Sequence, residues 1–233
     1  MSRSYFQFKQ FCIHHDHCAM KVGTDGVLLG AWGCVEGHRI LDIGTGTGLI
    51  ALMAAQRNPV AQVLGIDIDE QAVQQAKENL ADSPFNKRVS CVLQDVLTFQ
   101  PDATYDAILC NPPFFTEDTM PDDALRALAR NNSKLPFSSL IPKVASMLSA
   151  NGSFSVIIPS KLVQEFVGIC LIENLYLQRR CQVRTTSKKT PRRALLTFFK
   201  EPVTKCEEQE ICIMAANGTK TKEFIELTKD YYL

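Results

Sequence analysis

The sequence lacks the features that mark membrane and exported proteins. Its first ten residues contain no apolar core of the signal-peptide kind, and no apolar run is long enough to cross a bilayer. It also lacks a charge bias, because 25 basic residues match 25 acidic ones. A neutral total neither supports nor excludes a nucleic-acid partner. These absences predict a cytoplasmic protein with no membrane association, and nothing in the sequence indicates an obligate protein partner.

Paired cysteines and metal-binding motifs are missing as well. The nine cysteines are odd in number, have no C-x-x-C spacing, and include Cys91 and Cys110 inside apolar runs. This pattern favours free thiols in a reducing compartment over a disulfide framework. The segment from His14 to Cys18 reads HHDHC, but adjacent side chains rarely converge on one ion and no second ligand cluster is visible. We therefore expect no metal site.

Strand-like and helix-like segments alternate along most of the chain. Strands are expected at residues 39–43, 63–67, 88–93, 105–110 and 153–158, and helices at 49–57, 70–80, 138–148 and 161–173. The helix at 138–148 is expected to end at the Asn151-Gly152 signal. Such alternation predicts βαβ units around a parallel sheet that is buried on both faces.

The last part of the chain departs from this alternation. Strands expected at 178–184 and 194–200 have no clear helix between them, which predicts an antiparallel pair at the sheet edge. A short strand and a helix are expected within 211–233. With no internal repeat and no long linker, we predict one domain over residues 1–233, with residues 1–36 as an N-terminal extension packed on its core.

A glycine-rich segment follows the first strand of the alternation. It reads Asp42-Ile43-Gly44-Thr45-Gly46-Thr47-Gly48, and we call Gly44–Gly48 the glycine loop. Glycines permit a tight turn and close approach of a ligand, although ordinary turns use them too. About twenty residues later Asp67 ends the next strand, where an acid binds ribose hydroxyls in Rossmann-like folds. The pair of features predicts a nucleotide site.

The spacing and charge of this site favour one class of nucleotide. The loop has GxGxG spacing, whereas the nicotinamide fingerprint is GxGxxG. An acid at the mouth of the loop, Asp42, would repel a diphosphate but not a sulfonium that carries an ammonium group. We therefore expect S-adenosylmethionine. Asp95, after the third strand, is expected to accept a hydrogen bond from the adenine amino group, with a turn cap as the alternative.

The fourth strand ends in Asn111-Pro112-Pro113-Phe114. Asn-Pro commonly marks a turn, but this one follows a central strand, at the edge where open α/β sheets bind ligands. The prolines stiffen the loop and offer no N–H, so Asn111 and the Pro112 carbonyl are expected to accept both hydrogens of an exocyclic amine. Phe114 is expected to stack on its base. Two converging acceptors would aim the amine lone pair at a methyl group.

Together these motifs resemble the class I amino-methyltransferases. Lys21–Gly30, Phe114-Phe115 and the Tyr231-Tyr232-Leu233 end resemble one subgroup, the bacterial tRNA1(Val) adenine-37 N6-methyltransferases, and the likeness runs from about Phe6 to Leu233. It implies a Rossmann-like α/β fold with a mostly parallel seven-stranded sheet, an antiparallel edge strand and helices on both faces. It also implies methyl transfer from S-adenosylmethionine to adenine N6 in tRNA. The implied catalytic residues are Asn111, Pro112, Pro113 and Phe114, and the implied cofactor residues are Thr24, Asp25, Asp42, Gly44, Gly46, Gly48, Asp67, Ile68, Asp95 and Asn111.

A basic stretch lies between Asn174 and Lys200. It contains eight Lys and Arg residues and no acidic residue, which suits contact with phosphates better than a solvated face in a neutral protein. We expect RNA contacts in its central part, from Lys188, Lys189, Arg192 and Arg193.

Three other functions stay open at this level. Guanine-N2 methyltransferases of ribosomal RNA also carry Asn-Pro-Pro-Phe. Glutamine methyltransferases of release factors usually have Tyr in place of Phe114 and a helical N-terminal domain. A non-catalytic RNA-binding module could keep the fold, although an intact Asn-Pro-Pro-Phe argues against it.

Overall fold

The computed structural model describes residues 5–16, 22–113 and 135–233, and a mixed β-sheet runs through these ranges. The strands are β3 (Arg39–Ile43), β4 (Gln62–Asp67), β5 (Val89–Leu93), β6 (Tyr105–Cys110), β7 (Leu148–Pro159), β8 (Tyr176–Thr186), β9 (Arg193–Phe199) and β10 (Glu207–Met214). Their order is β10-β8-β9-β7-β6-β3-β4-β5. A separate hairpin pairs β1 (Tyr5–Gln7) with β2 (Cys12–His14).

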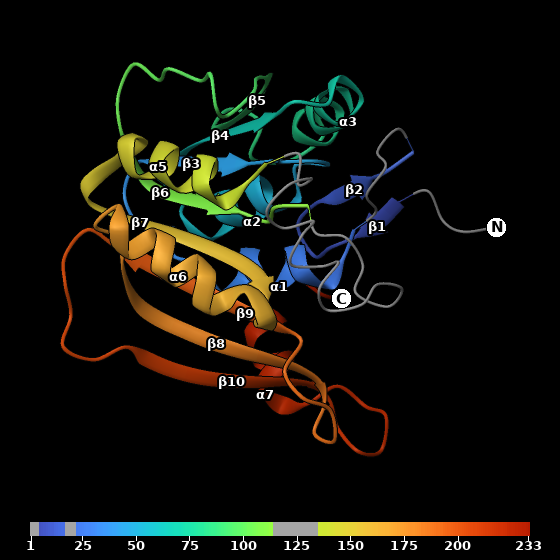
Figure 1. Cartoon of the computed structure of the whole chain (residues 1–233). Coiled ribbons are helices and arrows are strands. Elements are labelled where there is room, and N and C mark those ends of the chain that lie inside the picture. Colours follow the sequence, from blue (N-terminus) through green and yellow to red (C-terminus); the bar gives the residue numbers. More distant parts are fainter. Residues whose placement is uncertain (1–4, 17–21, 114–134) are drawn as a thin grey trace.

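Helices cover both faces of the sheet (Figure 1). They are α1 (Thr24–Trp32), α2 (Leu49–Arg57), α3 (Glu70–Ala81), α5 (Phe137–Met147), α6 (Val163–Ile172), α7 (Lys222–Thr228) and the short 3-10 helix η2 (Ser160–Leu162). Successive residues of β3 point to opposite faces, so Ile40 joins the core under α1, α2 and α3 while Leu41 joins the core under α5 and α6. This two-sided burial confirms the predicted α/β class.

Two details of the predicted sheet are wrong. The described residues form eight strands in this sheet, not seven, and the antiparallel strand is not at the edge. Strand β9 lies between β7 and β8 and is antiparallel to both, while β10 pairs in parallel with β8 and forms the edge. The prediction placed a strand only from Ile211 onward because the first half of β10 is exposed and rich in glutamate. An edge strand of this kind has no apolar alternation to reveal it.

The boundary between α5 and β7 also differs from the prediction. Helix α5 ends at Met147 and β7 begins at Leu148, without an intervening turn. The Asn151-Gly152 pair lies inside β7, where the pairing with β6 is irregular. The signal therefore marks a strand irregularity and not a helix end.

Residues from both ends of the chain contact the same core. Phe8, which follows β1, and Ile13, in β2, are fully buried. The Lys9 amide donates to the Tyr231 carbonyl over 2.8 Å, and the Tyr231 hydroxyl donates to the Met53 carbonyl of α2 over 3.4 Å. In the described ranges no helix is long and apolar enough to cross a membrane.

Candidate active site

The predicted site residues follow the ends of four neighbouring strands. In the sheet order β6-β3-β4-β5, Cys110 pairs with Ile43, Ile43 with Ile66, and Asp67 with Leu93. The segments that begin at Asn111 and Gly44, together with Asp67 and Asp95, therefore lie along one edge of the sheet. This is the edge at which open α/β sheets bind their ligands.

The glycine loop has a backbone that requires glycine. Gly44, Gly46 and Gly48 have φ angles of +69°, +55° and +83°, in the left-handed region that other residues rarely adopt. The amides of Gly44 and Thr45 both donate to the Ile66 carbonyl, which ties the loop to β4. A Cβ on Gly44 would meet no atom within 4 Å, and one on Gly46 would meet only a backbone oxygen at 4.0 Å. The loop thus presents an open backbone surface.

Asp67 holds this loop from the end of β4. One carboxylate oxygen accepts the Gly46 amide over 2.9 Å, and the other accepts the Asp69 amide over 3.0 Å. Each oxygen keeps a second lone pair for a ligand hydroxyl. The neighbouring Ile68 is 67% exposed, which is unusual for an isoleucine beside a core strand. Asp67 therefore contacts the glycine loop, and the next residue along the chain offers an exposed apolar side chain.

The position of Asp42 differs from the expectation. The carboxylate is not at the mouth of the loop but fully buried, where one oxygen accepts the Thr45 hydroxyl over 2.6 Å and the other has no partner among the described residues. Burial is the main reason that the pKa of Asp42 rises from 3.8 to about 7. A group with this pKa is only partly ionised at neutral pH. Asp42 therefore repels a diphosphate less than a fully ionised carboxylate at the mouth of the loop would.

The half-buried Asp95 adopts the turn cap that was the alternative to adenine binding. Its Oδ1 accepts the Leu97 amide over 2.9 Å. Asp95 lies at the same edge of the sheet as Asp67. Its contact with adenine stays a prediction.

The Asn-Pro-Pro segment leaves the sheet at the end of β6. Asn111 is half-buried, Pro112 is buried and Pro113 is exposed. The structure gives the Asn111 amide group no hydrogen bond within the described residues, and its role as an acceptor stays a prediction. Phe114 lies outside the described residues.

One buried polar residue of the site was not predicted. Asn79, on α3, is 1% exposed. Its amide oxygen accepts the His14 backbone N–H, and its amide nitrogen donates to the carbonyls of His14 and Thr47, all over 2.9 Å. Asn79 therefore joins the N-terminal hairpin to the glycine loop. The sequence does hold a signal, because Asn79 follows Ala76 by three residues in the apolar stripe of this helix.

Thr24 and Asp25 lie in the first turn of α1. Thr24 is exposed, whereas the half-buried Asp25 accepts a hydrogen bond from Arg193 Nε over 2.9 Å. The structure thus joins a residue expected to bind cofactor to one expected to bind RNA.

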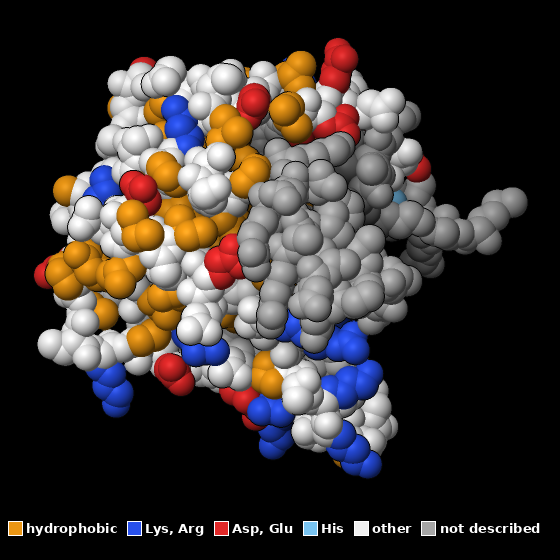
Figure 2. Space-filling view, viewed as in Figure 1, with side chains coloured by type: hydrophobic (Ala, Val, Ile, Leu, Met, Phe, Trp, Pro, Cys, Tyr) orange, Lys and Arg blue, Asp and Glu red, His pale blue; other side chains and the backbone are white. Residues whose placement is uncertain are grey.

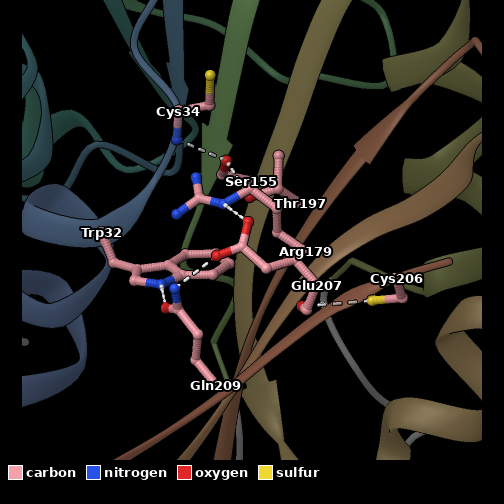
Figure 3. A network of polar contacts seen from close by, with 8 residues as sticks. All are labelled: Trp32, Cys34, Ser155, Arg179, Thr197, Cys206, Glu207 and Gln209. Atoms are coloured by element: carbon pink, nitrogen blue, oxygen red, sulfur yellow. Dashed lines mark hydrogen bonds and ion pairs between the residues drawn. The ribbon is translucent and has the colours of Figure 1, made fainter.

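Part of the positive charge of the basic stretch lies beside acidic residues that are distant in the sequence. Arg179, Arg180 and Arg184 of β8 lie beside glutamates of β10, at N–O distances of 3.7, 3.9 and 2.7 Å; the glutamates are Glu207, Glu208 and Glu210. Figure 3 shows Arg179 within a network in which its guanidinium lies 4.4 Å from the centre of the Trp32 ring. Each of these arginines thus has a carboxylate of β10 close by, which reduces the positive charge that it presents to a phosphate.

Three further positive charges of the stretch lie in the connection between β8 and β9, residues 187–192, which we call the basic loop. Lys188, Lys189 and Arg192 are exposed there. The loop lies between the end of β8 and the start of β9, at the same edge of the sheet as Asn111. Figure 2 shows Lys and Arg side chains gathered around this end of β8 and β9.

The HHDHC segment is described only in part, since His17 and Cys18 lie outside the described residues. His14 joins the Asn79 contacts through its backbone. Within the described part of the chain, no group of three or more His, Cys, Asp or Glu side chains could hold a metal ion.

Comparison with known proteins gives consistent matches. Residues 23–176 match the family described as Methyltransferase small domain. A Bacteroides thetaiotaomicron protein named tRNA1(Val) (adenine(37)-N6)-methyltransferase is 45% identical over 236 residues, covering 100% of this chain and 99% of that protein. A relative of the same name from Flavobacterium psychrophilum is 43% identical over 98% of this chain and 99% of its own length. A crystal structure of a predicted O-methyltransferase from Agrobacterium tumefaciens, 17% identical, superposes with a TM-score of 0.70 over 89% of this chain and 96% of that chain, which shows a shared fold.

Proposed function

The chain belongs to the family of tRNA1(Val) (adenine(37)-N6)-methyltransferases, and we propose that it methylates the exocyclic N6 amine of adenine 37 in tRNA1(Val). S-adenosylmethionine is the methyl donor. The observation that carries the proposal is the full-length identity to these relatives, together with an Asn-Pro-Pro segment at the carboxyl end of β6.

The edge of the sheet fits the cofactor in shape and chemistry. We propose that the open backbone at Gly44 and Gly46 receives it and that Asp67 accepts hydrogen bonds from its ribose hydroxyls. Ile68 offers an exposed apolar surface to the adenine ring. The buried carboxyl group of Asp42, partly ionised at neutral pH, would add negative potential beneath the loop, which suits a cationic ligand. When bound, the cofactor would supply an activated methyl group whose leaving group is a neutral thioether.

We propose that Asn111 and Pro112 orient the target amine. An aromatic amine is a poor nucleophile because its lone pair is delocalised into the ring. The Asn111 side-chain oxygen and the Pro112 carbonyl would accept the two N6 hydrogens and favour a pyramidal nitrogen. Since the leaving group is neutral, no strong base is needed, and orientation supplies most of the catalysis. We also propose, from the sequence motif, that Phe114 stacks on the target adenine.

The charge distribution indicates where tRNA would lie. The basic loop, with Lys188, Lys189 and Arg192 exposed, offers cations to phosphates beside the end of β6. On the other side of the glycine loop, a cleft against α3 is lined by acidic and amide side chains, which repel phosphate or leave it unpaired; they are Asp16, Glu70, Gln71, Gln74 and Glu78. We propose that the tRNA body lies over β8 and β9. Because tRNA is a cytoplasmic substrate in bacteria, we also propose that the protein acts in the cytoplasm.

Methylation of total RNA from a strain that lacks this protein tests the proposal. The protein is incubated with labelled S-adenosylmethionine, and the RNA is fractionated and digested to nucleosides. We expect label in tRNA as N6-methyladenosine. Label on guanine N2 in ribosomal RNA, or on a release factor, would replace the proposed function with one of its rivals. Cofactor binding without any labelled product would indicate a non-catalytic module.

A further inference from the structure

An ion pair joins two regions that the proposed function treats separately. Arg193, at the end of the basic loop, donates from Nε to Asp25 Oδ2 over 2.9 Å. The two side chains are 25% and 33% exposed, so neighbouring groups shield the pair partly from water. Shielding of this degree makes an ion pair stronger than a fully exposed one.

The Asp25 end of the pair lies beside the glycine loop. Residues 26–32 of α1 are all buried, and this helix packs along α2, which begins directly after the loop. The contact is close, because a Cβ on Gly26 would lie 3.2 Å from Leu49 Cδ2, the first residue of α2. The far end of α1 is held by Arg57, whose Nη1 donates to the carbonyls of Gly30 and Gly33.

The Arg193 end of the pair is anchored in the sheet. As the first residue of β9, Arg193 pairs with Pro159 of β7 and with Val183 of β8. The preceding Arg192 is held by its backbone, which donates to the Val183 carbonyl and accepts the Ser160 amide. A fixed strand end thus holds the first turn of α1 through one guanidinium.

We propose that Arg193 is a positioning residue of the cofactor site and that it does not bind tRNA phosphate. The inference rests on the proposed function, because it removes Arg193 from the basic side chains that were expected to contact RNA. By fixing Asp25, Arg193 holds the first turn of α1, with the exposed Thr24, beside the glycine loop. A phosphate that took Arg193 would leave Asp25 unpaired, so RNA binding is left to Lys188, Lys189 and Arg192 of the basic loop.

Calorimetry with S-adenosylhomocysteine, the full chain and no RNA tests this role. Arg193→Ala and Asp25→Asn are each expected to weaken binding about tenfold, the scale of one charge-assisted hydrogen bond. The double variant should bind S-adenosylhomocysteine as tightly as the single variant with the lower affinity, because Arg193 acts only through Asp25. Arg193→Lys should recover most of the affinity. The matched control is Arg39→Ala. It removes an Arg–Asp pair of 2.7 Å, between Arg39 and Asp102, at the amino end of β3 and away from the cofactor site. We expect it to change the affinity less than twofold.

A second readout separates positioning from phosphate binding. Arg193→Ala is expected to keep the wild-type dependence of tRNA affinity on salt. An unchanged affinity for S-adenosylhomocysteine, or effects of the two single variants that multiply in the double variant, would overturn the proposal. So would a salt slope reduced by about one, the signature of a lost phosphate contact. Because the calorimetry contains no RNA, its outcome is independent of whether tRNA is the substrate.

Discussion

Raising the pH from 5 to 8 is expected to destabilise the protein through Asp42, and Asp42→Asn should remove that effect. The carboxyl group is fully buried, and its one side-chain hydrogen bond in the described structure comes from the Thr45 hydroxyl. Burial, the largest cause, raises the pKa of Asp42 from 3.8 to about 7. An asparagine has nearly the same shape and no proton to lose.

The sign follows from proton binding in the two states. Between pH 4 and pH 7 the folded protein holds the Asp42 proton and the unfolded chain releases it. The free energy of unfolding therefore falls as the pH rises through this window and is level above pH 7. The part of the window between pH 5 and pH 7 spans about two pKa units, which corresponds to about 2.5 kcal/mol.

Urea unfolding of the wild-type protein and Asp42→Asn at both pH values measures this term. Groups other than Asp42 cancel when the two proteins are compared at one pH. We expect Asp42→Asn to gain about 2.5 kcal/mol relative to wild type between pH 5 and pH 8. Asp102→Asn is the control, since a hydrogen bond from Arg39 lowers the pKa of Asp102 and leaves it ionised at both pH values. If Asp42→Asn and the wild-type protein differ in free energy of unfolding by the same amount at pH 5 and pH 8, Asp42 does not have a raised pKa in the folded state.

Three further predictions concern the loop, the hairpin and the RNA. Asp67→Ala should weaken binding of S-adenosylhomocysteine by about 1.5–3 kcal/mol in calorimetry, because a charged acceptor is lost, and an unchanged affinity would exclude its ribose role. Asn79→Ala leaves buried backbone groups unpaired and should lower the free energy of unfolding by about 3 kcal/mol, against less than about 0.5 for the exposed Gln74→Ala; equal effects would contradict this. Replacing Lys188 and Lys189 by Ala should reduce the salt slope of tRNA binding by roughly 1.4–1.8, and an equal slope would place the RNA elsewhere.

Local patterns were sufficient to predict most of the fold. The periodicity placed α2 at its observed residues and β4 within one residue, because both elements are buried and lie in the regular part of the alternation. Strand β10 was missed in its first half, since its stability comes from pairing with β8 and from ion pairs such as Arg184–Glu210. Such contacts join residues that no local window contains together.

The same limit applies to the site. Positions at strand ends, such as Asp67 and Asn111, follow from topology and could be predicted. The depth of Asp42 could not, because burial depends on how the glycine loop folds back over β3 and β4. The pairing of the β8 arginines with glutamates and the Asp25–Arg193 pair needed the three-dimensional arrangement, since each partner lies far away in sequence.

Single-turnover methylation of tRNA by Asn111→Ala, at saturating cofactor, tests whether the Asn-Pro-Pro segment orients the target amine. The variant loses one of two acceptors proposed to orient the amine, so the rate of methyl transfer should fall at least about a hundredfold. Its affinity for S-adenosylhomocysteine should change far less than the rate. Asn86→Ala, at an exposed position beyond α3, should keep the wild-type rate. We expect N6-methyladenosine as the product; a near-normal rate for Asn111→Ala, or a product methylated on guanine, would show that this segment does not orient an adenine amine.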